Sequence, residues 1–369
     1  MIVRNIKFSL GELFCGPGGM ALGAHNAAKV VKSVSITHAW ASDYDKATCD
    51  TYIRNIPGAS EKTVFCEDVR KLKISKLGPI DGFAFGFPCN DFSLVGEKMG
   101  VNGTFGPLYT YGVDVLKKYS PKWFVAENVG GLSSSNEGSA FLEILNDLAK
   151  AGIHGGYSLV PHLYKFENYG VPQARHRILI VGIRKDLKIE FKVPSPDLYK
   201  HIDVSVKNAL TNPRISDTAA NHEFTRQAPH VVERLKHIKP GENAFNAKLP
   251  IALQLNVKGA KISQIYRRLH PDKPSYTVTG SGGGGTHVYH YKDPRALTNR
   301  ERARLQTFPD DFVFEGTKEN VRKQIGMAVP ARGAQVVFEA LFKSFAGKNY
   351  QSIESNMKKF VGSALDVKF

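Results

Sequence analysis

The feature that most constrains the fold is a repeated alternation of apolar runs with amphipathic runs, and its first unit lies near the N-terminus. Residues 10–15 have the pattern of a short buried strand, the glycine-rich turn 16–19 interrupts it, and residues 20–31 have a helical period. Strand, glycine turn and helix in this order allow backbone N–H groups to meet a ligand at a helix N-terminus. The spacing is not the GxGxxG of dinucleotide folds, so the turn alone is a weak indication of its ligand.

The alternation continues through the first half of the chain and predicts the α/β class. Further strands are expected at 35–42, 63–66, 80–87, 122–126, 157–166 and 178–183, and helices at 46–54, 108–118 and 141–151. With 369 residues, the chain is long enough for two structural units.

Acidic residues follow several of these strands. Asp43 and Tyr44 come directly after strand 35–42, Asp68 follows strand 63–66, and Glu127 follows strand 122–126. A carboxylate at the end of the second strand is placed to accept both hydroxyls of a ribose, and an aromatic ring beside it can stack on a base. The alternative for Asp43 is that it caps the helix 46–54.

Cys89 is the strongest candidate for a nucleophile. It follows Pro88 at the end of the apolar run 80–87, and the proline ring fixes the backbone so that the sulfur has one direction. The structural alternative is a small buried hydrophobic residue, which is the commoner role of a lone cysteine. The glycine-punctuated segment 94–106, which contains Lys98, has the composition of a lid.

Charge and cysteine usage narrow the class of protein. The formal net charge is +16, which favours a polyanionic partner, although a merely soluble basic protein is the alternative. The four cysteines form neither a CxxC pair nor a disulfide framework, which favours a reducing compartment. The N-terminus has no signal-peptide pattern and no run approaches 18 apolar residues, so we expect a cytoplasmic protein.

The second half of the chain loses the α/β pattern and becomes more basic. Residues 192–273 contain 14 Lys and Arg against 7 Asp and Glu, which indicates a second, smaller, basic domain. The glycine-rich segment 280–285 lies between two strand-like runs, 276–279 and 286–291, so close approach to a ligand is at least as probable as a flexible linker. Helix 297–306 has a capping box, and the apolar helix 333–345 is fit to pack on the first domain.

Five motifs, in this order, resemble those of the DNA (cytosine-5) methyltransferase family across residues 13–336. They are FxGxGG at 14–19, PCxxFS at 88–93, ENV at 127–129, QxRxR at 173–177, and the arginine-to-threonine segment 267–279 before the glycine loop. The resemblance implies a Rossmann-like catalytic domain with a mostly parallel sheet, a smaller inserted DNA-recognition domain and a C-terminal helix that returns to the catalytic domain. The boundaries we expect are 1–187, 188–292 and 293–369.

The resemblance also implies the reaction, the methyl donor and the roles of residues. S-adenosylmethionine would donate its methyl group to carbon 5 of a flipped-out cytosine in a specific duplex DNA sequence, through a covalent adduct with Cys89. Glu127 would hold N3 and the amine of the base, Arg177 its oxygen, and Arg175 would support the site. The expected cofactor residues are Phe14, Gly16, Gly18, Gly19, Asp43, Tyr44, Asp68, Val69, Pro88 and Leu108. The expected DNA-contacting residues are Asn90, Ser93, Lys98, Gln264, Arg267, Thr277, Gly282, Gly283 and Gly284.

Two residues depart from the family pattern. Asn90 stands where the family commonly has Gln, and Met327 stands where it commonly has Asn. The shorter amide weakens a contact near the flipped nucleotide, and Met327 removes a polar contact near the methionine end of the cofactor.

Three other classes share part of the pattern. A catalytically silent relative would not need Cys89, Glu127, Arg175 and Arg177 together, and a nicotinamide dehydrogenase has no use for PCxxFS or QxRxR. An RNA methyltransferase of the same lineage is disfavoured by the basic inserted domain. We therefore expect a monomeric prokaryotic modification enzyme that is paired with a cognate restriction endonuclease and needs no metal.

Overall fold

The structure is a computed structural model that describes residues 5–87, 108–130, 139–256, 263–283 and 285–360. It divides into two compact units. The first unit comprises residues 1–165, 176–198 and 333–369, and the second comprises 166–175 and 199–332. The catalytic, recognition and C-terminal boundaries expected from the sequence are functional ones, and they remain predictions.

A seven-stranded sheet forms the centre of the first unit, with the strand order β3-β2-β1-β4-β5-β8-β6. The strands are β1 (Ile6–Leu13), β2 (Val34–Asp43), β3 (Val64–Cys66), β4 (Gly82–Gly86), β5 (Trp123–Val129), β6 (Tyr157–Lys165) and β8 (His176–Arg184). The first five strands pair in parallel, and β8 pairs antiparallel with β5 and β6. The predicted α/β class and mostly parallel sheet are confirmed.

The strand order reverses between β1 and β4. From β1 the chain moves outward to β2 and β3 and then returns to β4 on the other side of β1. In open α/β sheets, ligands bind outside the carboxyl ends of the strands at such a switch point. The topology therefore places any ligand site beside the residues that follow β1, β2, β4 and β5.

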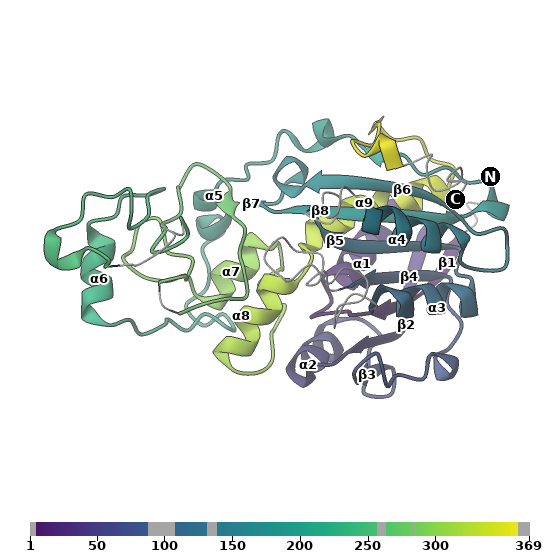
Figure 1. The fold of residues 1–369 in the computed structure, drawn as a ribbon, viewed down its shortest axis with the longest axis horizontal. Helices are drawn as coiled ribbons and strands as arrows, with labels where there is room; N and C mark the ends of the chain where they lie inside the picture. Colours follow the sequence, from purple (N-terminus) through teal and green to yellow (C-terminus); the bar gives the residue numbers. More distant parts are fainter. Residues whose placement is uncertain (1–4, 88–107, 131–138, 257–262, 284, 361–369) are drawn as a thin grey trace. The chain divides into compact units, whose positions relative to one another are not determined.

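Helices cover both faces of this sheet, as Figure 1 shows. Their bounds are α1 (Gly19–Val31), α2 (Lys46–Asn55), α3 (Tyr109–Tyr119), α4 (Ser139–Lys150) and α9 (Ala331–Phe345). Apolar residues of α3 and α4 share one core with Phe83, Phe85 and Phe124 of the sheet. On α9, Phe342 packs against Phe8 and Trp123, with ring centroids 5.9 Å from each, so this helix packs on the sheet of the first unit.

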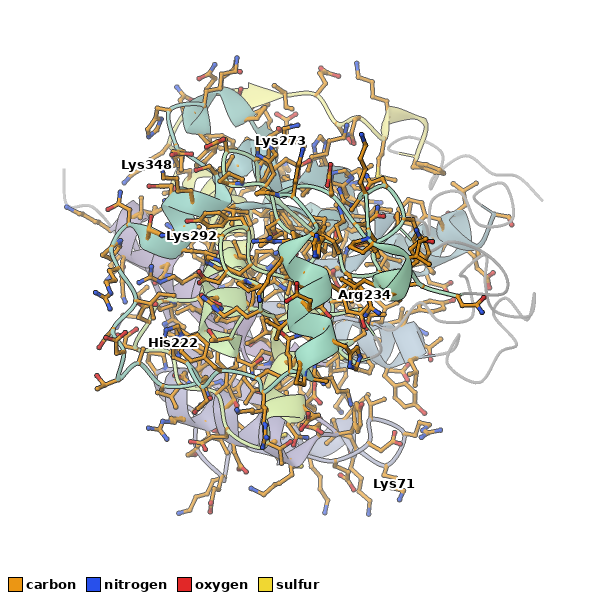
Figure 2. The ribbon with its side chains drawn as sticks, turned by 90° about the vertical axis from the view of Figure 1, so that its left-hand side faces the viewer. Lys71, His222, Arg234, Lys273, Lys292 and Lys348 are labelled. Atoms are coloured by element: carbon orange, nitrogen blue, oxygen red, sulfur yellow. The ribbon has the colours of Figure 1, made fainter. Side chains whose placement is uncertain are left out.

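The second unit has shorter elements and a small core. Its helices are α5 (Val206–Thr211), α6 (Pro229–Lys236), α7 (Asn299–Leu305) and α8 (Lys318–Met327), and β7 (Gln173–Ala174) pairs in parallel with β10 (Ser275–Tyr276). Leu235, Ile238 and Tyr289 are buried together. Arg234 on α6 (Figure 2) lies 4.8 Å from the Tyr266 ring centre and donates to the carbonyl of Leu253.

Two predictions for the second unit have opposite outcomes. The capping box of α7 is present, because Thr298 and Glu301 exchange hydrogen bonds between side chain and backbone. The strand expected at 286–291 is wrong, since this segment forms only isolated bridges, from Tyr289 to Arg268 and Ala296. An apolar run without a neighbouring strand to extend its ladder remains an irregular segment.

The remaining elements are short. Strands β9 (Val193–Pro194) and β11 (Ser352–Ile353) form an antiparallel pair, and 3₁₀ turns lie at Ile74–Lys76, Phe166–Tyr169, Lys185–Leu187, Pro196–Tyr199, Ile251–Leu253 and Lys358–Phe360. Among the described residues, one stretch, Lys318–Phe345, is long and apolar enough to cross a membrane, and 78% of its apolar window is buried inside the protein. Burial of that extent is typical of a core helix.

Candidate functional site

The turn after β1 has a left-handed backbone and one open side. Phe14, Gly16 and Gly18 have φ angles of 52°, 55° and 98°. A Cβ on Gly18 would lie 2.8 Å from the side chain of Ile56, whereas a Cβ on Gly16 would have no described residue within 4 Å. Helix α1 begins at Gly19 without a side-chain cap. The turn therefore presents free space and the positive end of a helix at the switch point.

Asp43 joins the end of β2 to this turn. Its Oδ2 accepts a hydrogen bond from the Gly16 N–H at 3.0 Å, and its Oδ1 accepts one from the Asp45 N–H at 3.1 Å. Burial raises the pKa of Asp43, and the two N–H donors partly oppose this. The helix-cap alternative for Asp43 is wrong, because the N-cap of α2 is Asp45, whose side chain accepts from the Thr48 N–H at 2.9 Å.

The other expected cofactor residues of the first unit that the structure describes lie after β2, after β3 and at the start of α3. The side chain of Tyr44 is 61% exposed, and Val69 and Leu108 are buried in the same apolar cluster. Asp68 accepts hydrogen bonds from the backbone N–H and the Nε of Arg70, each at 2.9 Å. These bonds lower the pKa of Asp68 to about 2, so its carboxylate is ionised at neutral pH.

Glu127 and Arg177 form an ion pair at the end of β5. Arg177 Nε lies 2.9 Å from Glu127 Oε1, and both side chains are nearly buried. A Cβ on Gly86, which pairs with Glu127 across the sheet, would lie 3.1 Å from Glu127 Oε2. Because Gly86 has no side chain, the carboxylate can lie over the last residue of β4.

The end of β4 is fixed beside this ion pair. The side-chain amide of Asn128 donates to the carbonyl of Phe87 at 3.1 Å. The next expected site residues, Pro88, Cys89, Asn90, Ser93 and Lys98, lie outside the described residues, as does Gly284. In the sequence, Cys89 follows Phe87 by two positions.

Arg175 and Arg177 do not share a target in the way that an extended QxRxR segment would predict. Arg175 is 1% exposed and donates to the carbonyls of Val278 and Met327 at 3.2 and 3.4 Å. Arg177 instead pairs with Glu127. The reason is local, because β7 ends before residue 175 and β8 begins after it, so the two side chains do not belong to one continuous strand.

The expected base-reading residues lie in the second unit. Gln264 is exposed, and its carbonyl accepts from the Arg267 N–H at 3.2 Å. The Arg267 guanidinium lies 4.7 Å from the Tyr276 ring centre, and the Tyr276 hydroxyl donates to the Arg267 carbonyl at 2.9 Å. Thr277 donates its hydroxyl to the carbonyl of Ala174 at 2.8 Å, which is an internal structural contact. These contacts hold Arg267 in one orientation, and no carboxylate among the described residues forms an ion pair with it.

Glu12 is a polar residue that the sequence reasoning missed. It lies within β1, is fully buried, and accepts a hydrogen bond from the Tyr52 hydroxyl, which also contacts His38 Nδ1 at 3.4 Å. Burial raises the pKa of Glu12 to about 8. The available signal was an acidic residue inside an otherwise apolar strand pattern.

The described ranges contain no group of three His, Cys, Asp or Glu side chains that could hold a metal ion. The residues around the turn after β1 instead suit a nucleoside with a charged tail. They offer a carboxylate to a diol, an exposed ring to a base, and an uncapped helix N-terminus to a carboxylate. The described part of the site therefore fits S-adenosylmethionine.

Comparisons with known proteins point in one direction. The family model for C-5 cytosine-specific DNA methylases matches residues 8–343. Type II methyltransferase M.BbvI from Brevibacillus brevis is 59% identical over 358 residues, which are 95% of each chain. Type II methyltransferase M.NgoFVII from Neisseria gonorrhoeae is 36% identical and covers 94% of this chain and 89% of its own.

Solved structures agree on the fold. The S. pombe Dnmt2 methyltransferase superposes with a TM-score of 0.60 at 16% identity, over 92% of this chain and 99% of its own. The Entamoeba histolytica methyltransferase EhMeth gives a TM-score of 0.61 at 15% identity, over 92% of this chain and 97% of its own.

Proposed function

The chain belongs to the C-5 cytosine-specific DNA methylase family, as a DNA (cytosine-5-)-methyltransferase of the prokaryotic restriction-modification type, and from this premise we propose how its residues perform the reaction. The methyl group goes from S-adenosylmethionine to carbon 5 of a cytosine that is flipped out of a specific duplex DNA sequence. Cys89 forms a covalent adduct with the base during the transfer. The observation that carries this proposal is the Glu127–Arg177 ion pair beside the end of β4, which lies three residues before Cys89 in the sequence.

The cofactor site is the turn after β1 together with the ends of β2 and β3. Asp43 binds the ribose hydroxyls, Tyr44 stacks on the adenine, and Asp68 accepts from its amine. The N-terminus of α1 lies at the methionine carboxylate. When bound, S-adenosylmethionine supplies an electrophilic methyl group. Phe14, Gly16, Gly18, Gly19, Val69, Pro88 and Leu108 complete the lining.

The chemistry at the base uses three side chains. The Cys89 thiolate adds to carbon 6 of cytosine, which makes carbon 5 nucleophilic toward the methyl group. Carbon 5 takes the methyl group as the methyl–sulfonium bond of the donor breaks. The proton at carbon 5 then passes to a water molecule, and the bond between sulfur and carbon 6 breaks, which restores the Cys89 thiolate. Glu127 binds N3 and the exocyclic amine, where charge changes as the ring loses aromaticity, and Arg177 binds the base oxygen. Arg175 supports the segment through its carbonyl contacts.

The Glu127–Arg177 contact makes this assignment chemically specific. An arginine that is already bonded to the carboxylate orients it, so the carboxylate need not reorganise when the base arrives. A flipped base is necessary because carbon 5 and carbon 6 cannot be reached by a thiolate inside a stacked duplex, and flipping costs roughly a few kcal/mol.

Duplex DNA is the proposed partner of the second unit. Gln264 and Arg267 read bases, while Asn90, Ser93, Lys98 and the turn Gly282–Gly284 contact the strand near the flipped nucleotide. The stacking of Arg267 on Tyr276 supports base readout, since a held guanidinium can present two donors to guanine. We further propose that the protein is a cytoplasmic monomer. We also propose that it works with a cognate restriction endonuclease, because its relative M.BbvI is a type II methyltransferase.

The covalent step is tested with Cys89→Ser and with duplex DNA that carries 5-fluorocytosine in the target site. The purified enzyme's own methylation pattern on genomic DNA identifies that site. We expect the serine variant to lose methyl transfer while it still binds DNA, because a hydroxyl is a weak nucleophile at neutral pH. The wild-type protein should form a stable adduct with the fluorinated duplex, since fluorine does not leave as the proton does.

Cys66→Ser, assayed at saturating S-adenosylmethionine, is the matched control, because Cys66 is an exposed thiol at the end of β3, beside the proposed cofactor site and not after β4. It should retain both turnover and adduct formation. Turnover by the Cys89 variant, or absence of an adduct with the wild-type protein, would refute the covalent mechanism. A parallel assay with tRNA and labelled methyl donor separates DNA from RNA as the substrate.

A further inference from the structure

Two arginines on α7 are equally buried but differ in their partners. Arg300 is 0% exposed, and its three guanidinium nitrogens donate to the carbonyls of Ala220, Pro309 and Phe312 at 2.7–2.9 Å. Arg302 is 1% exposed, and neither of its terminal nitrogens has a hydrogen-bond partner within the described residues. A buried guanidinium without partners is costly, so this difference needs a physical reason.

The strongest charged neighbour of Arg302 is another cation, while Glu301 favours the charged form of Arg302 more weakly. Arg322 on α8 lies close enough to disfavour the charged form of Arg302, and its own Nε is buried without a partner in the described part of the chain. Arg322 reaches Glu319 only at 3.8 Å, where the carboxylate is 75% exposed. The nearby Glu301 is already bonded to Arg295 at 2.7 Å.

The charge of Arg302 persists at neutral pH. Burial, and then the charge of Arg322, lower the pKa of Arg302 to about 10, which still leaves the guanidinium protonated. Burial and the same two arginines lower the pKa of His287 to about 4, so this imidazole is neutral at pH 7. The cluster of Arg302, Arg322 and His287 therefore has two positive charges, and the one carboxylate within ion-pair distance of them among the described residues is the exposed Glu319, 3.8 Å from Arg322.

The turn Gly280–Gly283 lies against two members of this cluster, Arg322 and His287. A Cβ on Gly282 would be 2.6 Å from Arg322 Nε and 2.9 Å from His287 Cε1. A Cβ on Gly283, whose φ is 122°, would have no neighbour within 4 Å among the residues that the structure describes. Since glycine leaves the backbone uncovered, an anion can approach the turn from its exposed side. Arg322 is the guanidinium that touches the turn, and its charge acts on Arg302.

We propose that Arg302 and Arg322, beneath the turn Gly280–Gly283, form a phosphate site that binds one backbone phosphate of duplex DNA. The inference rests on the proposed function, because it assumes that the second unit binds DNA. A phosphate supplies several acceptor oxygens and a negative charge, which match the unpaired donors of two guanidinium groups. The site carries no sequence information, so it fixes the protein on the duplex while other residues read bases.

The first test compares Arg302→Met with the matched control Arg300→Met by thermal unfolding, in sodium chloride and in sodium phosphate of equal ionic strength. Arg302→Met should unfold at the same or a higher temperature than wild type in chloride, because it removes an unpaired buried charge. It should also lose the stabilisation by phosphate that wild type shows. Arg300→Met should unfold at a lower temperature, since three carbonyls lose their donors, yet should keep the phosphate effect.

The second test measures affinity for a mixed-sequence duplex as a function of salt concentration. We expect Arg302→Met to bind roughly tenfold more weakly at low salt, equally for all sequences. Its slope of log affinity against log salt should be reduced by about one. A duplex with single methylphosphonate linkages should lose affinity for wild type at one position and lose none there for Arg302→Met.

Three results would overturn the inference. An unchanged salt slope for Arg302→Met excludes a contact with a DNA phosphate. If Arg302→Met loses the thermal stabilisation by phosphate while its salt slope for DNA binding is unchanged, the site binds free phosphate only. Destabilisation of Arg302→Met equal to that of Arg300→Met, with the phosphate effect retained, makes Arg302 a structural residue. Failure of wild-type protein to methylate any DNA would instead contradict the proposed function, whatever the salt slope.

Discussion

Glu12 offers the sharpest test of the structure of the first unit. Its carboxyl group is fully buried in β1, where Oε2 accepts from the Tyr52 hydroxyl and Oε1 has no hydrogen-bond partner among the described residues. Glu12→Gln keeps the size and shape of the side chain and an oxygen for Tyr52. The substitution removes the ability of the side chain to ionise. It also places an amide nitrogen at the position of Oε1, and the effect of that nitrogen on the free energy of unfolding does not depend on pH.

The expected magnitude follows from the pKa. Burial raises the pKa of Glu12 from 4.5 to about 8, so ionisation is about 5 kcal/mol less favourable in the folded than in the unfolded chain. Between these values the folded chain holds a proton that the unfolded chain has released. The stabilisation is therefore complete below the unfolded pKa and is lost as the pH rises toward about 8.

We expect the free energy of unfolding of wild type to fall by about 2–2.5 kcal/mol more than that of Glu12→Gln between pH 6 and pH 8. Other groups near Glu12 titrate in both chains, so they largely cancel in the difference. Burial lowers the pKa of His38 to about 4, and burial raises the pKa values of Cys15 and Tyr52, so neither thiol nor phenol ionises in this range.

The assay is urea unfolding followed by tryptophan fluorescence, because Trp40 and Trp123 are both buried in the sheet. Glu61→Gln is the control, since Glu61 is an exposed carboxylate before β3, and its stability should follow the wild-type pH dependence. A difference between wild type and Glu12→Gln that stays constant from pH 6 to pH 8 would show that Glu12 does not hold a proton in the folded protein. That result would refute the conclusion that burial in β1 raises the pKa of Glu12.

Three further variants separate roles that the structure distinguishes. Asp43→Ala should weaken S-adenosylmethionine binding by roughly 1.5–3 kcal/mol in calorimetry. Asp45→Ala should lower the free energy of unfolding by about 1 kcal/mol, because α2 loses its cap, and should leave the affinity for S-adenosylmethionine unchanged. The reverse pattern would contradict both assignments. Arg267→Ala should cost roughly 1–3 kcal/mol on the proper site and relax discrimination at one base position, while a uniform loss on every single-base-substituted site with a smaller salt slope would make it a phosphate contact. Arg177→Met leaves the Glu127 carboxylate without its partner and should lower kcat more than it changes DNA affinity; an unchanged kcat would exclude orientation of Glu127 by Arg177.

Local sequence patterns were sufficient for the frame of the first unit. The apolar runs that end in Asp43, Asp68 and Glu127 do become parallel strands whose carboxyl ends meet at one edge. They are readable because a strand that is buried on both faces needs continuous apolar residues, and because a parallel sheet collects its strand ends on one side. The capping box of α7 was readable for a similar reason, since its two partners are three residues apart.

Contacts between residues distant in sequence required the tertiary structure. Asp43 and Asp45 are separated by one residue, yet only Asp43 faces the Gly16 N–H, and Asp45 takes the helix-cap role that the sequence left open for Asp43. The pKa of Glu12 depends on its complete removal from water, which its neighbours in sequence do not reveal.

The arginines of α7 illustrate the same limit most clearly. The sequence places Arg300 and Arg302 two residues apart on one helix, with the same side chain and the same charge. Only the fold brings the Ala220 carbonyl, eighty residues earlier in the chain, to Arg300. The same fold places Arg322 beside Arg302. Whether a buried charge is satisfied or available to a ligand is decided by such long-range neighbours, because hydrogen bonds and Coulomb forces act over a few ångströms of space and not along the chain.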